Sequence, residues 1–187
     1  MRILILLLFT PLIGLAQPSD FEEGLIIKNN NDSIYGLIKK RNQNPYYAYT
    51  EIKFKSGERG NIEIFTPDSV KEYILNGIRY ISKYLKHKKR NFFYEVIVDG
   101  YVSFYELEIQ RLDFKNPNSY TYYAILKKRD ETTELSFAEI DITYPFKKRM
   151  MEFFKDAPDL CNKIRNGIYN QTTIEKIVKE YNKLHKD

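Results

Sequence analysis

The sequence predicts an α+β protein, in which an antiparallel sheet of consecutive hairpins (roughly 24–143) precedes a helical segment (145–185) that packs on it. Up to residue 143, apolar and polar residues alternate in short runs separated by turn residues. From Pro145 onward, the spacing of apolar residues changes to three and four, which is the period of a helix. The chain also contains 16 Tyr and 12 Phe but no Trp, and tyrosine in such numbers favours strands.

The stretch 92–107 predicts the central hairpin. Its two apolar runs flank Asp99-Gly100, a dipeptide typical of a type I′ turn. A two-residue turn at this place sets Tyr94 opposite Tyr105. One face of this hairpin is almost wholly apolar and the other about half so, and we therefore expect two interior strands.

The other strands are expected to form hairpins around polar turns. The expected ranges are 24–28 with 33–39, 50–55 with 61–65, 72–75 with 78–81, and 120–126 with 133–137. Asn76-Gly77 is a second type I′ signal and sets Tyr73 opposite Tyr80. Ile140 and Ile142 are candidates for a short edge strand.

Three helices are expected after Pro145. The first carries the apolar stripe that begins at Phe146, and the second covers 158–166 and stops at Gly167. The third begins at Thr172, where the residue pattern matches a capping box, and continues as an apolar stripe to Leu184.

Residues 1–16 have the pattern of a secretory signal peptide: a positive start, an apolar core, and small residues before cleavage between Ala16 and Gln17. A membrane anchor would need about 20 apolar residues. We therefore expect residues 17–187 to form a single exported α+β domain without a transmembrane span. Its expected location is the periplasm, the periplasmic face of the outer membrane, or the extracellular space.

The chain has a formal net charge of +5 and a pI of about 9.0. A basic balance raises the prospect of nucleic acid as a partner, but export argues against it, so we expect no nucleic acid partner. The densest positive cluster consists of Lys83, Lys86, Lys88, Lys89 and Arg90. We interpret it either as a contact for an envelope protein, a glycan or an anionic lipid surface, or as a solvated loop between hairpins.

The order of these features resembles an uncharacterised family of exported proteins common in Bacteroidota. The resemblance rests on the Gly24-Leu25-Ile26-Ile27 hairpin, the Thr66-Pro67-Asp68 turn, the 95–100 hairpin and the tail from Phe153 to Asn182. It covers nearly all of the chain after the signal peptide. The resemblance implies an envelope location and no known activity.

The sequence predicts no catalytic residue, metal site or cofactor. His87 and His185 have no Cys or His neighbours at ligand spacing, and we expect both on the solvated surface. Cys161, the only cysteine, excludes an internal disulfide framework and lies on an apolar helix stripe, so we expect it in the core.

Glu95 is the acid with the most apolar predicted surroundings. We expect it to form a buried ion pair with Arg79 or Arg111. The function predicted from the sequence is an exported non-catalytic envelope protein, a binding or structural module. The alternative is a hydrolase that acts on envelope polymers through a carboxylate pair near Glu95. The oligomeric state stays open.

Overall fold

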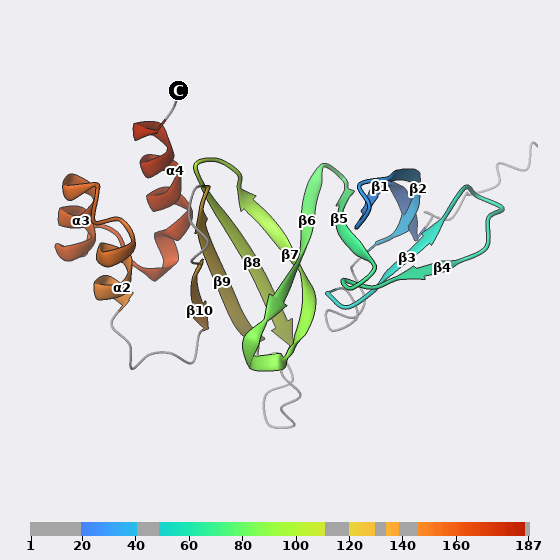
Figure 1. Cartoon of the computed structure of the whole chain (residues 1–187), viewed down its shortest axis with the longest axis horizontal. Helices are drawn as coiled ribbons and strands as arrows, with labels where there is room; N and C mark the ends of the chain where they lie inside the picture. The colour runs from blue at the N-terminus through green and yellow to red at the C-terminus, as the bar shows by residue number, and fades with distance from the viewer. Residues whose placement is uncertain (1–19, 41–48, 111–119, 130–133, 139–145, 186–187) are drawn as a thin grey trace, which may run out of the picture.

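The computed structural model describes residues 20–40, 49–110, 120–129, 134–138 and 146–185. They form one ten-stranded antiparallel sheet followed by C-terminal helices, so the predicted α+β fold of consecutive hairpins is confirmed (Figure 1). The strand order is β10-β9-β8-β7-β6-β5-β1-β2-β3-β4. The strands are β1 Phe21–Lys28, β2 Ser33–Lys39, β3 Ile52–Lys55, β4 Glu63–Phe65, β5 Val70–Leu75, β6 Ile78–Leu85, β7 Arg90–Val98, β8 Val102–Gln110, β9 Tyr120–Lys128 and β10 Glu134–Ala138. Ile140 and Ile142 lie outside the described residues.

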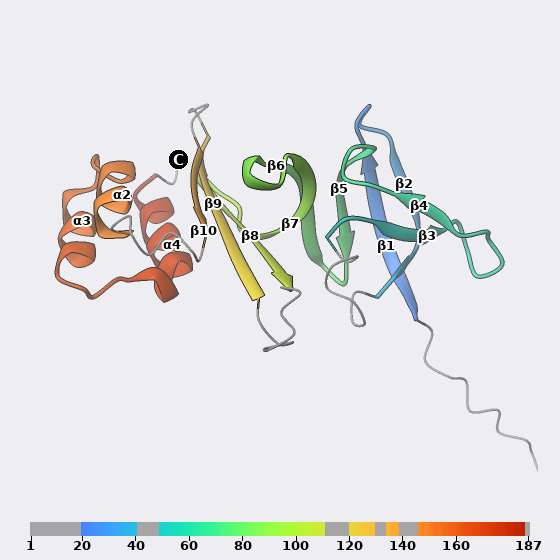
Figure 2. The same ribbon diagram turned by 90° about the horizontal axis from the view of Figure 1, so that it is seen from below.

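The helices gather at the β8–β10 end of the sheet, and the view turned by 90° also shows them on the β10 side, far from β1–β4 (Figure 2). They are α2 Phe146–Phe153, α3 Pro158–Arg165 and α4 Ile174–Leu184, with short 3₁₀ turns η1 at Lys86–Lys88 and η2 at Gln171–Thr173. Gly167 follows α3 with a positive φ of 78°, as a helix-stopping glycine does. The capping prediction was wrong by two residues. The capping residue is Asn170 rather than Thr172, and the Asn170 side chain accepts a hydrogen bond from the Thr172 N–H.

The predicted turn between β5 and β6 is confirmed. Asn76 and Gly77 both have positive φ, 53° and 75°, as a type I′ turn requires. Tyr73 lies opposite Tyr80, and their rings stack with centroids 4.7 Å apart. Local sequence and turn geometry agree here, so the register could be predicted.

The predicted register of the central hairpin was wrong by two residues. Tyr105 lies opposite Val96 rather than Tyr94, and Glu95 lies opposite Glu106. The register then shifts between Val96 and Val98, where a β-bulge inserts one residue. After a one-residue insertion, the following side chains point to the opposite face of the sheet. Val98 therefore belongs to the cluster beneath the helices.

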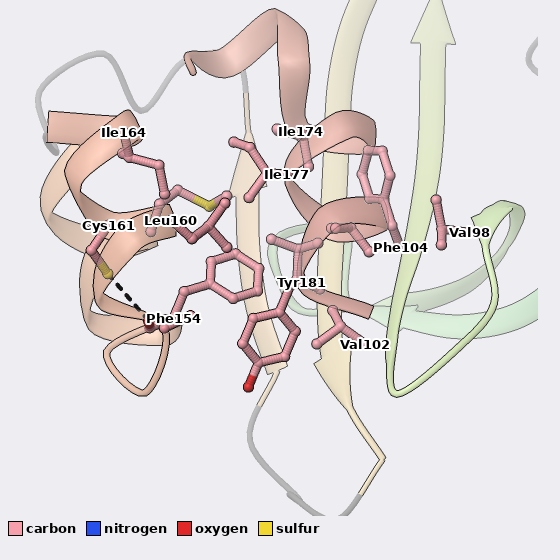
Figure 3. Packing of buried hydrophobic residues seen from close by; sticks show 14 of the residues in the cluster. Val98, Val102, Phe104, Phe154, Leu160, Cys161, Ile164, Ile174, Ile177 and Tyr181 are labelled. Atoms are coloured by element: carbon pink, nitrogen blue, oxygen red, sulfur yellow. Dashed lines mark hydrogen bonds between the residues drawn. The ribbon is translucent and has the colours of Figure 1, made fainter. Parts of the chain in front are cut away.

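The buried residues form three clusters. The first joins β7–β9 to the helices and includes Val102, Phe104, Phe154, Ile177 and Tyr181 (Figure 3). The second cluster gathers side chains of β1–β3 and β5–β7, including Ile26, Ile38, Phe54, Tyr73, Tyr80 and Phe93. The third lies on the opposite face of β7–β9 and includes Phe92, Tyr94, Tyr105, Leu107, Tyr123 and Ile125.

The sheet curls in two directions. Tyr80 belongs to the second cluster, whereas its neighbour Ile81 packs against the third, so the two cores lie on opposite faces of β6. A flat sheet would place β6 and β10 roughly 19 Å apart, yet Lys83 Nζ on β6 lies 2.5 Å from Glu134 Oε1 on β10. This pair therefore spans the concave side of the curled β6–β10 portion.

Candidate functional site

The tip of the β6–β7 hairpin carries the predicted basic cluster. The sequence predicted a loop at 83–90, but β6 continues to Leu85, β7 begins at Arg90, and only η1 and Lys89 connect them. The Lys89 N–H donates to Lys86 O at 3.2 Å and closes the turn. The connection is therefore a tight turn that fixes where its lysines project.

Three of the predicted cations form a compact positive site, which we call the basic tip: Lys86, Lys88 and Lys89. All three are exposed, and none forms an ion pair with any residue in the described part of the chain. Lys89 has a φ of 51°, a left-handed conformation that costs a non-glycine residue about 1 kcal/mol or more. Glycine would be easier to accommodate at this position.

The other two predicted cations face aromatic rings. Lys83 Nζ lies 4.4 Å from the Tyr105 ring centroid and pairs with Glu134, and its side chain is only 12% exposed. Arg90 is exposed, and its guanidinium carbon lies 5.0 Å from the Phe92 ring centroid. Lys83 therefore belongs to the concave side of the sheet, whereas Arg90 extends the basic tip.

Arg79 binds acids other than Glu95. Its Nε lies 3.0 Å from Glu72 Oε2 and its Nη1 lies 2.5 Å from Asp99 Oδ2. Arg111 lies outside the described residues, so its pairing with Glu95 stays a prediction.

Glu95 has another carboxylate directly across the strand pair. The register sets it opposite Glu106, and both side chains are half-buried. Directly opposite residues in antiparallel strands have Cβ atoms about 4.5–5.5 Å apart, and like charges at that distance repel. This pair resembles a paired-carboxylate site.

One polar cluster was not predicted from the sequence. Lys128 at the end of β9 is 7% exposed, and its Nζ lies 3.3 Å from Asp156 Oδ1 between α2 and α3. Tyr181 on α4 donates its hydroxyl to the other oxygen of Asp156. The cluster joins β9, the α2–α3 connection and α4, and the residues that pair are 28 and 25 positions apart in the sequence. No local motif therefore indicates it.

His185 lies beside this cluster. Its ring stacks on Tyr181 and Tyr101, with centroids 4.3 and 4.5 Å apart, so the expectation of a simply solvated histidine was wrong. The side chain of His87 lies outside the described set. Cys161 is buried as predicted, and its thiol donates to Phe154 O at 3.2 Å, the contact drawn in Figure 3.

The ionisation of two groups follows from these contacts. Burial acts to raise the pKa of Asp156, but hydrogen bonds from Tyr181, a main-chain amide and Lys128 outweigh it, so the pKa lies below its usual value. Burial raises the pKa of the Cys161 thiol, which keeps it protonated and unreactive.

Within the described ranges, no three His, Cys, Asp or Glu side chains are grouped to hold a metal ion. No helix among the same residues is long and apolar enough to cross a bilayer. No protein-family model, curated protein or solved structure matches this chain. The resemblance to exported Bacteroidota proteins therefore stays a prediction.

Proposed function

We propose that this chain is an exported, non-catalytic envelope protein that binds an anionic surface through the basic tip. The observation that carries the proposal is the state of Lys86, Lys88 and Lys89, which lie exposed within one tight turn without an ion pair among the described residues. Lys83, Lys128 and Lys163 have carboxylate partners. The tip differs from other exposed lysines, such as Lys148, Lys176 and Lys183, because its three lysines lie within one tight turn. Charge that is not neutralised within the protein is available to a partner.

The energy of such a contact is sufficient for reversible binding. A lysine close to an anionic lipid surface contributes about 1 kcal/mol. Three lysines therefore give about 3 kcal/mol, or roughly a 100-fold gain in affinity, which falls as salt screens the charges. The exposed ring of Tyr84, next to the tip in sequence and 55% exposed, adds an amphipathic group of the kind found at membrane interfaces.

The proposal is tested by expressing the full chain in a bacterium and separating periplasm, peptidoglycan and outer membrane. We expect export with loss of residues 1–16, and retention in an envelope fraction that Lys86→Gln, Lys88→Gln and Lys89→Gln together abolish. A matched control removes three exposed lysines from the helices: Lys148→Gln, Lys176→Gln and Lys183→Gln. A cytosolic protein that keeps residues 1–16 would contradict the proposal.

The second candidate function is hydrolysis of envelope polymers, because Glu106 lies directly opposite Glu95. Directly opposite residues have Cβ atoms about 4.5–5.5 Å apart, which brings the two carboxyl groups within reach of the separation of about 5–5.5 Å that retaining glycosidases use. Turnover of a peptidoglycan or glycan substrate that disappears in both Glu95→Gln and Glu106→Gln would establish this function. If neither substrate is turned over and the envelope binding of both variants is unchanged, the non-catalytic function stands.

A further inference from the structure

Tyr84 is an exposed aromatic side chain beside the basic tip. It lies on β6, two residues before Lys86, and is 55% exposed. Within the described part of the chain, its ring and hydroxyl form no hydrogen bond, ring stacking or cation–π contact. The other rings of this hairpin, those of Phe92, Phe93 and Tyr94, are buried. The hairpin therefore leaves an amphipathic ring in solvent next to its lysines, at an end of β6 that lies away from the helices (Figure 1).

We propose that Tyr84 and the basic tip together bind the headgroup layer of an anionic lipid bilayer, an assignment that rests on the binding function proposed above for the tip. The charge of the tip fits an anionic glycan or an acidic protein as well, but Tyr84 favours the bilayer. A tyrosine ring places its apolar body toward hydrocarbon and keeps its hydroxyl in water, and tyrosine is therefore enriched at membrane interfaces. Tyr84 adds a contact that salt does not screen.

The spacing of Tyr84 and the lysines fits the depth of a headgroup layer. Two residues of an extended strand span roughly 7 Å. A bilayer of roughly 40–45 Å contains a hydrocarbon core of roughly 30 Å, which leaves roughly 5–8 Å of headgroup region on each side. A hairpin whose lysines enter the headgroup region therefore brings the Tyr84 ring into the same region, without reaching the hydrocarbon core.

A carboxylate sets the limit of this contact surface. Tyr84 lies directly opposite Asn91, whose side-chain amide donates to Asp68 Oδ1 at 2.6 Å. Asp68 is exposed, and an anionic surface repels a carboxylate, so the contact includes Tyr84 and ends at Asp68. Asp68→Asn keeps the oxygen that accepts from Asn91 and removes the charge, and we expect it to tighten vesicle binding about fivefold. Unchanged vesicle binding in this variant would contradict a contact that extends to Tyr84.

Tryptophan fluorescence tests whether position 84 enters the bilayer. The chain contains no tryptophan, so Tyr84→Trp introduces a single reporter at the proposed contact. On addition of phosphatidylglycerol vesicles, we expect its emission maximum to move to shorter wavelength and its emission to be quenched by headgroup-labelled lipid. Tyr35→Trp is the matched control, because Tyr35 is 76% exposed and lies on β2, which is separated from β6 by β5 and β1. Its emission should stay unchanged.

Tyr84→Ser measures the share of the affinity that comes from the ring. We expect it to weaken vesicle binding roughly fivefold, since the ring loses its apolar contact. The loss should be the same at low and high salt, whereas the loss caused by the triple glutamine variant of the tip should shrink as salt rises. Binding to heparin, a soluble anionic glycan, should be equal for the wild type and Tyr84→Ser.

The failure of the bilayer as the partner is distinguishable from the failure of the proposed function. Vesicle binding without an emission shift in Tyr84→Trp, or binding of the wild type to heparin but not to vesicles, would overturn the bilayer and leave the binding function of the tip. An equal loss of heparin and vesicle binding in Tyr84→Ser would do the same. A wild type that binds neither vesicles nor heparin would overturn the proposed function itself.

Discussion

The side-chain amide of Asn182 makes both hydrogen bonds that a neighbouring strand would make to Val102. The Val102 N–H donates to Asn182 Oδ1 at 2.7 Å, and Asn182 Nδ2 donates to Val102 O at 2.8 Å. Gly100 lies beneath this amide, because a Cβ added there would be only 2.4 Å from Asn182 Nδ2. Helix α4 is thereby fixed to the start of β8.

Replacing Asn182 with alanine is expected to lower the free energy of unfolding by about 1–3 kcal/mol, since two hydrogen bonds of about 0.5–1.5 kcal/mol each are lost. Urea unfolding at neutral pH measures this change. Asn162→Ala is the control, because among the described residues its exposed side chain makes one hydrogen bond, which it accepts from Arg165. An equal decrease in the free energy of unfolding for Asn182→Ala and Asn162→Ala would contradict the role assigned to Asn182.

Asp156 is expected to contribute to acid sensitivity. Its pKa is lowered in the folded protein, so the folded state favours the ionised carboxylate more than the unfolded chain does. The resulting stability is fully present above the unfolded pKa of about 4 and is lost as the pH falls through the lower, folded pKa. The wild type should therefore lose more stability between pH 6 and pH 3 than Asp156→Asn, as measured by urea unfolding.

Two fully buried tyrosines are expected to respond to phenylalanine with opposite signs. Among the residues that the structure describes, the Tyr94 hydroxyl has no hydrogen-bond partner, whereas the Tyr181 hydroxyl donates to Asp156. Because an unpaired buried hydroxyl is destabilising, Tyr94→Phe should raise the free energy of unfolding by about 1 kcal/mol. Tyr181→Phe should lower it by about 1–2 kcal/mol. Thermal unfolding of both variants gives the sign of each change in stability. A loss of stability in Tyr94→Phe would show that the Tyr94 hydroxyl has a stabilising role.

Lys89→Gly is expected to separate stability from binding. Glycine removes the left-handed strain at φ 51°, offset in part by its greater freedom in the unfolded chain, for a net gain of about 0.5–1 kcal/mol. It also removes one charge from the basic tip. The free energy of unfolding should therefore rise while the affinity for anionic vesicles falls. Tighter vesicle binding by the Lys89→Gly variant would argue against the tip as the binding site.

The turns show why one register could be predicted and the other could not. Asn76 donates to Glu22 through its side chain, but no described atom lies within 4 Å of a Cβ added at Gly77, and the dipeptide adopts the turn that it favours. Gly100 is instead packed against Asn182, which is 82 residues away in sequence, and the turn there lengthens while the register shifts. A distant contact therefore overrides the local preference of Asp99-Gly100.

The candidate site was predictable only where its residues are local. The basic tip lies within one turn, so its lysines were visible as a run. Lys83 alternates with the apolar Ile81 and Leu85, which indicates the inward face of a strand, but its partner Glu134 is 51 residues away. Lys128 and Asp156 likewise meet only because the helices fold back onto the sheet.

Binding of the purified protein to phosphatidylglycerol vesicles across a range of salt concentrations tests the proposed function most directly. The account predicts reversible binding at low salt that weakens as salt rises. It predicts a loss of affinity of roughly 100-fold for the Lys86, Lys88 and Lys89 triple glutamine variant, and a much smaller loss for the triple variant at Lys148, Lys176 and Lys183. Equal losses for the two variants, which remove the same charge, would contradict a defined site at the hairpin tip.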